Sequence, residues 1–260
     1  MAKQTYEIAA IALLAALAAV LQLSNGIVGI PSPFGMKLDL AAAPVLLALF
    51  LFGFESALSV LAVLGLVIVF VSPDSFIGAS MKLGATLPML VVPALYLLYA
   101  KNRAAIAAIA ALFIVGGALA FSLAWNTGIT PKPLAGGPQE ARYLYGLSAL
   151  AVTALLAFGV YLLWSRGRAL PLSALGNERV ALLTLYGGIA LRAPIAVIAV
   201  YYYALPLYAG MTPEAAMAAV PAAVIVIWNA AQGIVEFAVA WLLAYRYGFA
   251  ERYGRRAADG

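Results

Sequence analysis

Residues 221–245 read PAAVIVIWNAAQGIVEFAVAWLLAY, an apolar run long enough to cross a bilayer as one helix. Three side chains in this run are strongly polar, namely Asn229, Gln232 and Glu236. Their spacing of i, i+3 and i+7 places them on one face of a helix. Polar groups within a membrane are costly and tend to face the helix bundle or a wet cavity. The run therefore predicts a transmembrane helix with one polar face directed inward.

The composition of the whole chain excludes a soluble globular domain. Hydrophobic residues make up 66% of the 260 residues and charged residues 10%, whereas soluble domains carry about 25% charged residues. The chain has neither Cys nor His, so disulfides, Cys/His metal sites and histidine proton shuttles are excluded, and we expect no metal and no cofactor. The formal net charge of +5 fits cytoplasmic loops beside anionic lipid better than nucleic-acid binding.

Further apolar runs predict an all-α polytopic membrane protein, a single transmembrane domain over residues 1–260. We expect a helical bundle of about eight transmembrane helices. The predicted spans are Ile8–Leu23, Leu40–Phe54, Ala57–Val71, Leu83–Ala100, Ala104–Trp125, Leu144–Trp164, Val180–Leu205 and Pro221–Tyr245. The second and third are short, and only a tight turn around Gly53 and Glu55 divides them.

The distribution of cations predicts the orientation. If the amino terminus is cytoplasmic, ten Lys and Arg residues fall inside, four (Lys37, Lys82, Lys132 and Arg142) fall outside, and Arg192 lies within a helix. This asymmetry favours a multi-pass protein of the cell membrane with both termini cytoplasmic. A cleaved signal peptide is the alternative for the first run, but Glu7 interrupts its basic start.

Arg192 lies about a dozen residues beyond Arg179, and Glu236 lies about ten residues before Arg246. At 1.5 Å per residue the two side chains reach similar depth, so we expect them to be partners. The simplest interpretation is a structural ion pair between the last two spans.

Asn229 and Gln232 have no obvious ionic partner in the sequence. Their amides could bind a planar polar ligand or join two helices by hydrogen bonds, and both interpretations stay open. Trp228 and an inward tyrosine, for which we take Tyr202, would then form a stacking wall. Tyr201 and Tyr203 are alternatives, and an interfacial aromatic belt is the other explanation for these side chains.

Two further features lie near the ends of predicted spans. Lys37 and Asp39 stand at the outer edge of the second span, where Asp39 is placed to cap the helix and Lys37 either extends to lipid headgroups or reaches a ligand. In the first span, Ala12, Ala16 and Ala19 belong to a stripe of small residues that allows close approach of another helix.

Several of these motifs resemble one family in their order and spacing. Lys37-Leu-Asp39, the apolar stretch with Pro44, and Leu51-Phe-Gly53 resemble the start of the second helix in S components of energy-coupling factor (ECF) vitamin transporters, particularly the riboflavin type. Asn229-Ala-Ala-Gln232-Gly233 is similar to that type's last-helix pattern of Asn, two residues, Lys and Gly. Tyr203-Ala-Leu-Pro206 resembles its Leu-Pro exit.

The resemblance covers residues 6–103 and 178–247, with two departures. Gln232 stands where the family has Lys, and we expect residues 104–164 to form a two-helix insertion into a family that ordinarily has six spans. The resemblance implies a subunit that binds its vitamin from outside, with riboflavin or a related flavin as the expected substrate and the loop Ser24–Asp39 above the site. The implied substrate-binding residues are Lys37, Asp39, Tyr202, Trp228, Asn229 and Gln232.

The resemblance also implies partners, because such subunits carry no ATPase of their own. This chain has no G-x-x-x-x-G-K-[ST] motif, so ABC transporter activity would require a transmembrane T component and two ATP-binding-cassette subunits. Ala12, Ala16 and Ala19 would form the docking surface for the T component. The alternatives are an S component for another vitamin or nucleobase-like substrate, an intramembrane enzyme using Arg192 and Glu236, and an ion-coupled carrier.

Overall fold

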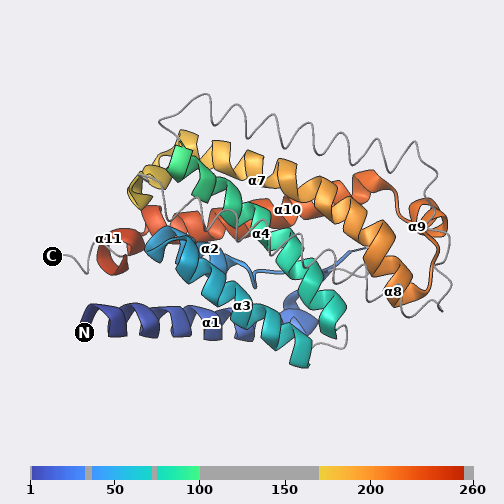
Figure 1. The fold of residues 1–260 in the computed structure, drawn as a ribbon, viewed down its shortest axis with the longest axis horizontal. Helices are drawn as coiled ribbons and strands as arrows, with labels where there is room; N and C mark the ends of the chain where they lie inside the picture. The colour runs from blue at the N-terminus through green and yellow to red at the C-terminus, as the bar shows by residue number, and fades with distance from the viewer. Residues whose placement is uncertain (1, 33–36, 72–74, 100–169, 255–260) are drawn as a thin grey trace.

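A computed structural model of the chain describes residues 2–32, 37–71, 75–99 and 170–254 (Figure 1). The predicted spans over 104–125 and 144–164, and with them the proposed insertion, lie outside the described residues. The elements are α1 (Ala2–Val28), β1 (Ile30–Pro31), β2 (Lys37–Leu38), α2 (Ala43–Phe52), α3 (Phe54–Val71), α4 (Ser75–Tyr99), η1 (Leu172–Gly176), α7 (Glu178–Ala199), η2 (Val200–Ala204), α8 (Leu205–Ala209), α9 (Pro213–Ala219), α10 (Ala222–Trp241), η3 (Leu242–Arg246) and α11 (Phe249–Tyr253).

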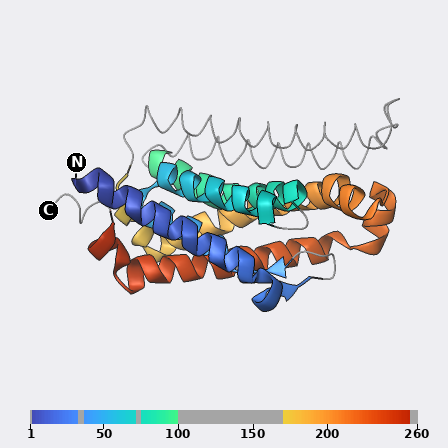
Figure 2. The same cartoon turned by 90° about the horizontal axis from the view of Figure 1, so that it is seen from below.

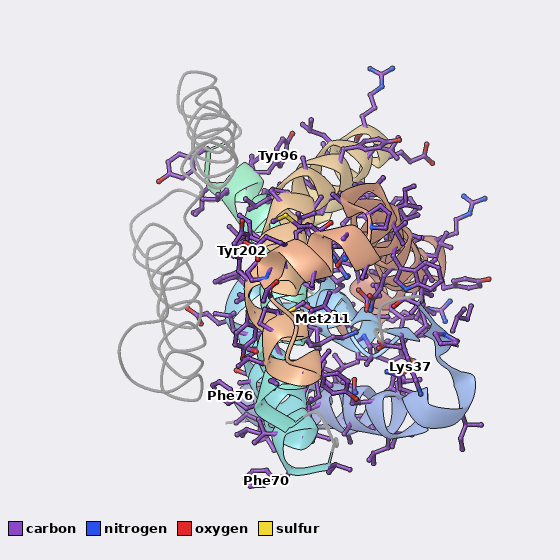
Figure 3. All side chains as sticks on the ribbon, turned by 90° about the vertical axis from the view of Figure 1, so that its right-hand side faces the viewer. Lys37, Phe70, Phe76, Tyr96, Tyr202 and Met211 are labelled. Carbon is purple, nitrogen blue, oxygen red and sulfur yellow. The ribbon has the colours of Figure 1, made fainter. Side chains whose placement is uncertain are left out.

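The prediction of a mainly helical chain with several apolar spans is confirmed. In the described ranges, five continuous helical stretches are long and apolar enough to cross a membrane: Thr5–Asn25, Phe54–Val71, Phe76–Tyr99, Glu178–Ala209 and Ala222–Arg246. Large apolar side chains remain exposed along these helices, including Leu13 on α1 at 71% and Phe70 on α3 at 82%. Figure 3 shows Phe70 and Phe76 at the outer edge of the bundle. This exposure fits a lipid environment.

The second predicted span, Leu40–Phe54, corresponds to a helix that is shorter than the five long apolar stretches. α2 has 10 residues, which at 1.5 Å per residue gives about 15 Å, half the thickness of the hydrocarbon core. All ten of its residues are buried, because the helix lies in the centre of the bundle and packs against α1, α3 and α10. A helix that is apolar on every side is typical of a buried element.

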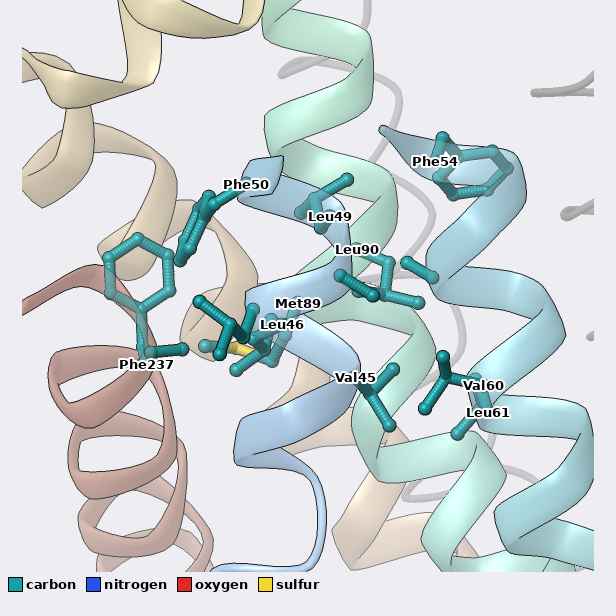
Figure 4. Close-up of a cluster of buried hydrophobic side chains, with 14 of the residues drawn as sticks. Val45, Leu46, Leu49, Phe50, Phe54, Val60, Leu61, Met89, Leu90 and Phe237 are labelled. Carbon is teal, nitrogen blue, oxygen red and sulfur yellow. The ribbon is translucent and has the colours of Figure 1, made fainter. Parts of the chain in front are cut away.

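The core surrounds α2, as Figure 4 shows. Leu46 and Phe50 of α2, Leu61 of α3 and Leu90 of α4 are each at most 2% exposed. Phe50 meets Phe237 of α10 edge to face, with ring centroids 5.3 Å apart. The core therefore joins the first half of the described chain to its last long helix.

α1 begins and α11 ends at the same end of the bundle, while α8 and α9 lie at the opposite end (Figures 1 and 2). The hydroxyl of Tyr6 in α1 donates to the carbonyl of Tyr253 in α11 at 3.2 Å. The antiparallel β1–β2 hairpin pairs Ile30 with Leu38 and Pro31 with Lys37, and it follows the other end of α1. The end of the bundle with the hairpin, α8 and α9 is called the hairpin end below.

The turn between α2 and α3 depends on Gly53, as the sequence predicts. Its φ of 101° and ψ of −173° fall in a region that is essentially restricted to glycine. Its backbone N–H donates to the carbonyls of Ala48 and Leu49. This conformation lets the chain leave α2 and start α3 after a single residue.

We expect Gly53→Ala to lower the free energy of unfolding by about 1–3 kcal/mol, because a Cβ strains this backbone conformation. Gly84→Ala in α4 is the control, since a Cβ there would meet only Ile195 at 3.9 Å and alanine favours helix over glycine. Thermal unfolding of the purified protein in detergent measures both variants. Equal melting temperatures for the two would contradict the role of Gly53.

Candidate ligand-binding site

Seven polar side chains from five segments meet between the hairpin end and the middle of the bundle. They come from α1, the segment before α2, α4, α7 and α10, and we call them the polar cluster. Its members are Asn25, Asp39, Lys82, Arg192, Asn229, Gln232 and Glu236.

Two ion pairs at the centre of the polar cluster share Lys82. Its Nζ lies 2.6 Å from Asp39 Oδ1 and 3.0 Å from Glu236 Oε1. The second carboxylate oxygen of Glu236 lies 3.3 Å from Arg192 Nη1. The side chains are 8–11% exposed for Asp39 and Lys82 and 1% for Arg192 and Glu236. Two cations and two carboxylates thus neutralise one another in the interior, as buried charges require.

Arg192 and Glu236, expected to be partners from their depth, are therefore in direct contact. The sequence interpretation missed Lys82, which it placed in an outer loop. α4 begins at Ser75, eight residues before the predicted start of that span, so Lys82 lies inside the helix. The available signal was the apolar and small stretch Phe76–Met81, which extends the helical pattern backward from Leu83.

Asn229 and Gln232 both have charged partners, contrary to the expectation. Arg192 Nε donates to Asn229 Oδ1 at 3.4 Å, and Asn229 Nδ2 donates to the carbonyl of Ile225 at 3.0 Å. Gln232 Nε2 donates to Glu236 Oε1 at 3.1 Å. The two amides are 1% and 2% exposed. They therefore line the same buried charge network, with the amide of Asn229 held by Arg192.

Asp39 does not cap α2, because the helix begins at Ala43 and its N-cap residue is Ala42. Instead Asp39 Oδ1 accepts from the backbone N–H of Ala41 at 2.8 Å, and Oδ2 accepts from Asn25 Nδ2 at 3.0 Å. The same oxygen, Oδ1, also lies 2.6 Å from Lys82 Nζ. Asp39 consequently connects the carboxyl end of α1 to α4.

Lys37 lies in β2, on the α1 side of the bundle (Figure 3). Its Nζ lies 3.4 Å from the backbone carbonyl of Asn25 and the side chain is half-buried. Lys37 thus contacts the polar cluster at the backbone of Asn25. Asn25 itself was missed by the sequence interpretation, although it ends the polar stretch Gln22-Leu-Ser-Asn of α1.

The tyrosine taken as inward, Tyr202, is only half-buried, whereas Tyr201 and Tyr203 are buried. Tyr201 donates its hydroxyl to the carbonyl of Val220 at 2.7 Å, and Tyr203 shares a 2.7 Å hydrogen bond with Ser80 of α4. The two face different neighbours because they lie two residues apart in the π-helical turn η2. Tyr202 and Trp228 pack against the same small apolar cluster, which is formed by residues of α7, η2, α8, α9 and α10 and by Val220.

The small residues of α1 divide between two faces. Ala15 and Ala18 are buried against the bundle at 5% and 0% exposure, whereas Ala12 and Ala16 are exposed and Ala19 is half-buried. In the described ranges, the face with Ala12 and Ala16 is uncovered. Two of the three predicted docking residues, Ala12 and Ala16, are therefore exposed in the described ranges, and docking itself stays a prediction.

Four buried polar atoms have no hydrogen-bond partner among the described residues: Gln22 Oε1, Asn25 Oδ1, Thr86 Oγ1 and Trp228 Nε1. Leaving such atoms unpaired costs about 1–3 kcal/mol each. Gln22 and Asn25 belong to the last turns of α1, and Trp228 precedes Asn229. Thr86 follows Lys82 by one turn of α4.

In the described ranges, no three Asp or Glu side chains lie close enough together to hold a metal ion. Comparisons with protein-family models, curated proteins and solved structures find no match to this chain.

Proposed function

We propose that this protein is the membrane substrate-binding subunit, the S component, of an ECF-type ABC vitamin importer. It captures riboflavin or a related flavin from outside the cell. A transmembrane T component and two ATP-binding-cassette subunits supply the energy. The chain crosses the membrane several times with both termini cytoplasmic, which places the hairpin end outside.

The single observation that supports this proposal is the convergence of distant motifs. Asp39, from the motif before α2, and Gln232, from the motif in α10, are separated by most of the chain. Both contact the shared group formed by Lys82 and Glu236. These motifs carry the resemblance to the riboflavin-type S components, so the polar cluster is the natural position for the substrate.

The orientation is supported by the position of Lys82. Removing this buried residue from the outer loops leaves Lys37, Lys132 and Arg142 outside against ten cations inside, which strengthens the asymmetry. α4 and α10 both begin at the hairpin end (Figure 1). Lys82 and Asn229 each lie seven residues after the first residue of their helix, about 10 Å from that end.

The chemistry of the polar cluster suits a planar heterocycle with an amide edge. Such an edge presents alternating donors and acceptors, which the amides of Asn229 and Gln232 match. The indole of Trp228 supplies an aromatic face and a donor, since its N–H has no partner in the part of the chain that the structure describes. The buried charges are balanced, so a neutral ring can enter without leaving an ion uncompensated.

We expect Asn229→Ala to weaken riboflavin binding at least tenfold, equivalent to about 1.4 kcal/mol, because it removes one amide from the ligand edge. Quenching of riboflavin fluorescence by the purified protein measures the affinity. Asn177→Ala is the matched control, since Asn177 is exposed at the N-cap of α7 at the far end of the bundle. Unchanged affinity in Asn229→Ala would remove this residue from the site.

One observation favours a second candidate, an ion-coupled carrier. Carboxylates buried among apolar helices, here Asp39 and Glu236 on either side of Lys82, are common in proton-coupled transport. Uptake in reconstituted vesicles separates the two functions. Uptake that requires ATP and the ATP-binding-cassette subunits supports the S component, and uptake driven by a pH gradient with this chain alone supports the carrier.

A further inference from the structure

The chain turns sharply where α10 and η3 end, and the turn carries two exposed arginines. The long apolar stretch that includes α10 ends at Arg246. Gly248 follows with φ 74° and ψ 21°, a left-handed conformation that glycine adopts without strain. α11 then begins at Phe249 and runs back toward the start of α1 (Figure 2). The chain therefore leaves the axis of α10 as soon as the apolar stretch is complete.

α11 is fixed against the ends of two other helices. The carbonyl of Tyr253 accepts the hydrogen bond from Tyr6, which lies in the first turn of the apolar stretch Thr5–Asn25 of α1. Gly254 is buried, and an added Cβ there would lie 3.3 Å from the carbonyl oxygen of Leu51 at the end of α2. These contacts hold α11 across this end of the bundle.

Two separate apolar stretches place Arg246 and Arg252 at one boundary of the membrane. Arg246 is the last residue of the stretch that includes α10, and Arg252 precedes the residue that is hydrogen-bonded to the first turn of the stretch in α1. Arg252 Nε lies 3.9 Å from the position that a Cβ on Gly248 would occupy, so its guanidinium lies beside the turn that follows Arg246. Both arginines therefore lie at the level of the lipid headgroups.

The charge and the aromatic side chains of this segment indicate the partner. Arg246 and Arg252 are exposed, and no ion pair joins them to an acidic side chain among the described residues. Residues 246–256 read RYGFAERYGRR, with four arginines and one glutamate. Tyr247 and Tyr253 are 64% and 47% exposed, and tyrosine is enriched at the boundary between membrane and water. Basic residues interleaved with aromatic ones suit an anionic lipid surface, because a soluble acidic ligand would leave the rings in water.

We propose that residues 246–253 bind the headgroups of anionic phospholipids. Arg246 and Arg252 donate to the phosphate oxygens, for which the planar guanidinium is well suited, and Tyr247 and Tyr253 occupy the interfacial layer. Because α11 is joined to α1 and packs against the end of α2, a bound lipid stabilises the folded state. This site is separate from the polar cluster and does not depend on the vitamin.

Thermal unfolding in detergent micelles, with phosphatidylglycerol or phosphatidylcholine added in increasing amounts, tests the site. Phosphatidylglycerol should raise the melting temperature of the original protein at a lower concentration than phosphatidylcholine. Arg246→Gln and Arg252→Gln should each require about fivefold more phosphatidylglycerol for the same rise, which corresponds to about 1 kcal/mol for a basic residue near an anionic surface. About 1 M salt should remove the difference between the two lipids, because it screens charges beyond about 3 Å.

Two matched variants separate this site from the net charge of the protein. Lys37→Gln removes one positive charge at the hairpin end, and it should change the phosphatidylglycerol requirement by less than about twofold. Glu251→Gln removes the negative charge of α11 and should lower the requirement, in the opposite direction from the two arginine variants. Without added lipid, the variants of the exposed Arg246 and Arg252 should melt close to the original protein, which shows that they fold.

Equal stabilisation of the original protein by the two lipids would overturn the proposal, and so would an unchanged phosphatidylglycerol requirement in both arginine variants. Glycerol 3-phosphate carries the phosphate without the acyl chains. If it stabilises the original protein as strongly as phosphatidylglycerol at the same concentration, the arginines bind a soluble phosphate and the lipid is not the partner. None of these outcomes bears on flavin binding, which the fluorescence assay measures separately.

Discussion

Lys82→Met is expected to lower the free energy of unfolding by about 3–5 kcal/mol, the usual cost of breaking a buried ion pair by removing one partner. Methionine matches the length of the lysine stem, so the lost group is the ammonium. Among the described residues, Asp39 would then keep Asn25 and a backbone N–H as partners, and Glu236 would keep Arg192 and Gln232. Reversible unfolding in mixed detergent micelles provides the measurement.

Two further variants make this prediction specific. Lys37→Met removes the same charge from a half-buried lysine whose Nζ lies 3.4 Å from a backbone carbonyl, and we expect a smaller loss. Adding Asp39→Asn to Lys82→Met should recover part of the stability, because it removes the carboxylate left without a cation. A Lys82→Met protein as stable as the original protein would show that these ion pairs contribute nothing to the net stability of the fold.

The same change tests the site, because Lys82 connects the motif before α2 to α10. If Asp39 and Glu236 position the ligand groups, Lys82→Met should weaken flavin binding as well as stability. A loss of stability with unchanged affinity would assign the ion pairs a purely structural role.

The long spans were predictable because an apolar run is a local property of the sequence. Arg192 and Glu236 were predictable as partners for a similar reason, since counting 1.5 Å per residue from each helix end gives the depth of a side chain. A charged residue in the middle of an apolar run is also rare enough to require a partner. These arguments need only one helix at a time.

Lys82, Asn25 and the burial of α2 could not be predicted in this way. The stretch Phe76–Met81 indicates that Lys82 lies inside a helix, but it does not indicate that Lys82 contacts Asp39 and Glu236. The run containing α2 is apolar on every side, so composition does not distinguish a lipid-facing span from a core helix. The contact of Asp39 with Lys82 is set by the packing of separate elements, which no local pattern records.

Tyr202 shows a second limit of prediction from the sequence. The 100° step of an α-helix allows only one or two of three consecutive tyrosines to face inward. Which of them do so depends on their hydrogen-bond partners. The hydroxyl of Tyr201 donates to the carbonyl of Val220, and the hydroxyl of Tyr203 shares a hydrogen bond with Ser80. The buried hydroxyls required acceptors, and those acceptors lie on α4 and before α10, far from η2 in sequence.

Phe50→Ala should be comparably destabilising, by about 3–5 kcal/mol, because it leaves a cavity in the centre of the core. Phe50 is 1% exposed and its ring lies 5.3 Å from that of Phe237 and 5.6 Å from that of Tyr245. Phe70→Ala removes the same ring from a side chain that is 82% exposed, and it should change stability by less than about 1 kcal/mol. Unfolding in mixed micelles compares the two.

The Phe50→Ala variant also separates effects on the stability of the fold from effects on riboflavin binding. Phe50 lies near the carboxyl end of α2 and is not a member of the polar cluster, whereas Asp39 lies before the amino end of that helix. At temperatures where the variant remains folded, Phe50→Ala should therefore bind riboflavin within about threefold of the original protein. Lys82→Met should lower stability by a similar amount and should also weaken riboflavin binding. Should Phe50→Ala abolish flavin binding while still folded, the ligand would have to lie against the apolar core, and the polar cluster would be reduced to a structural element.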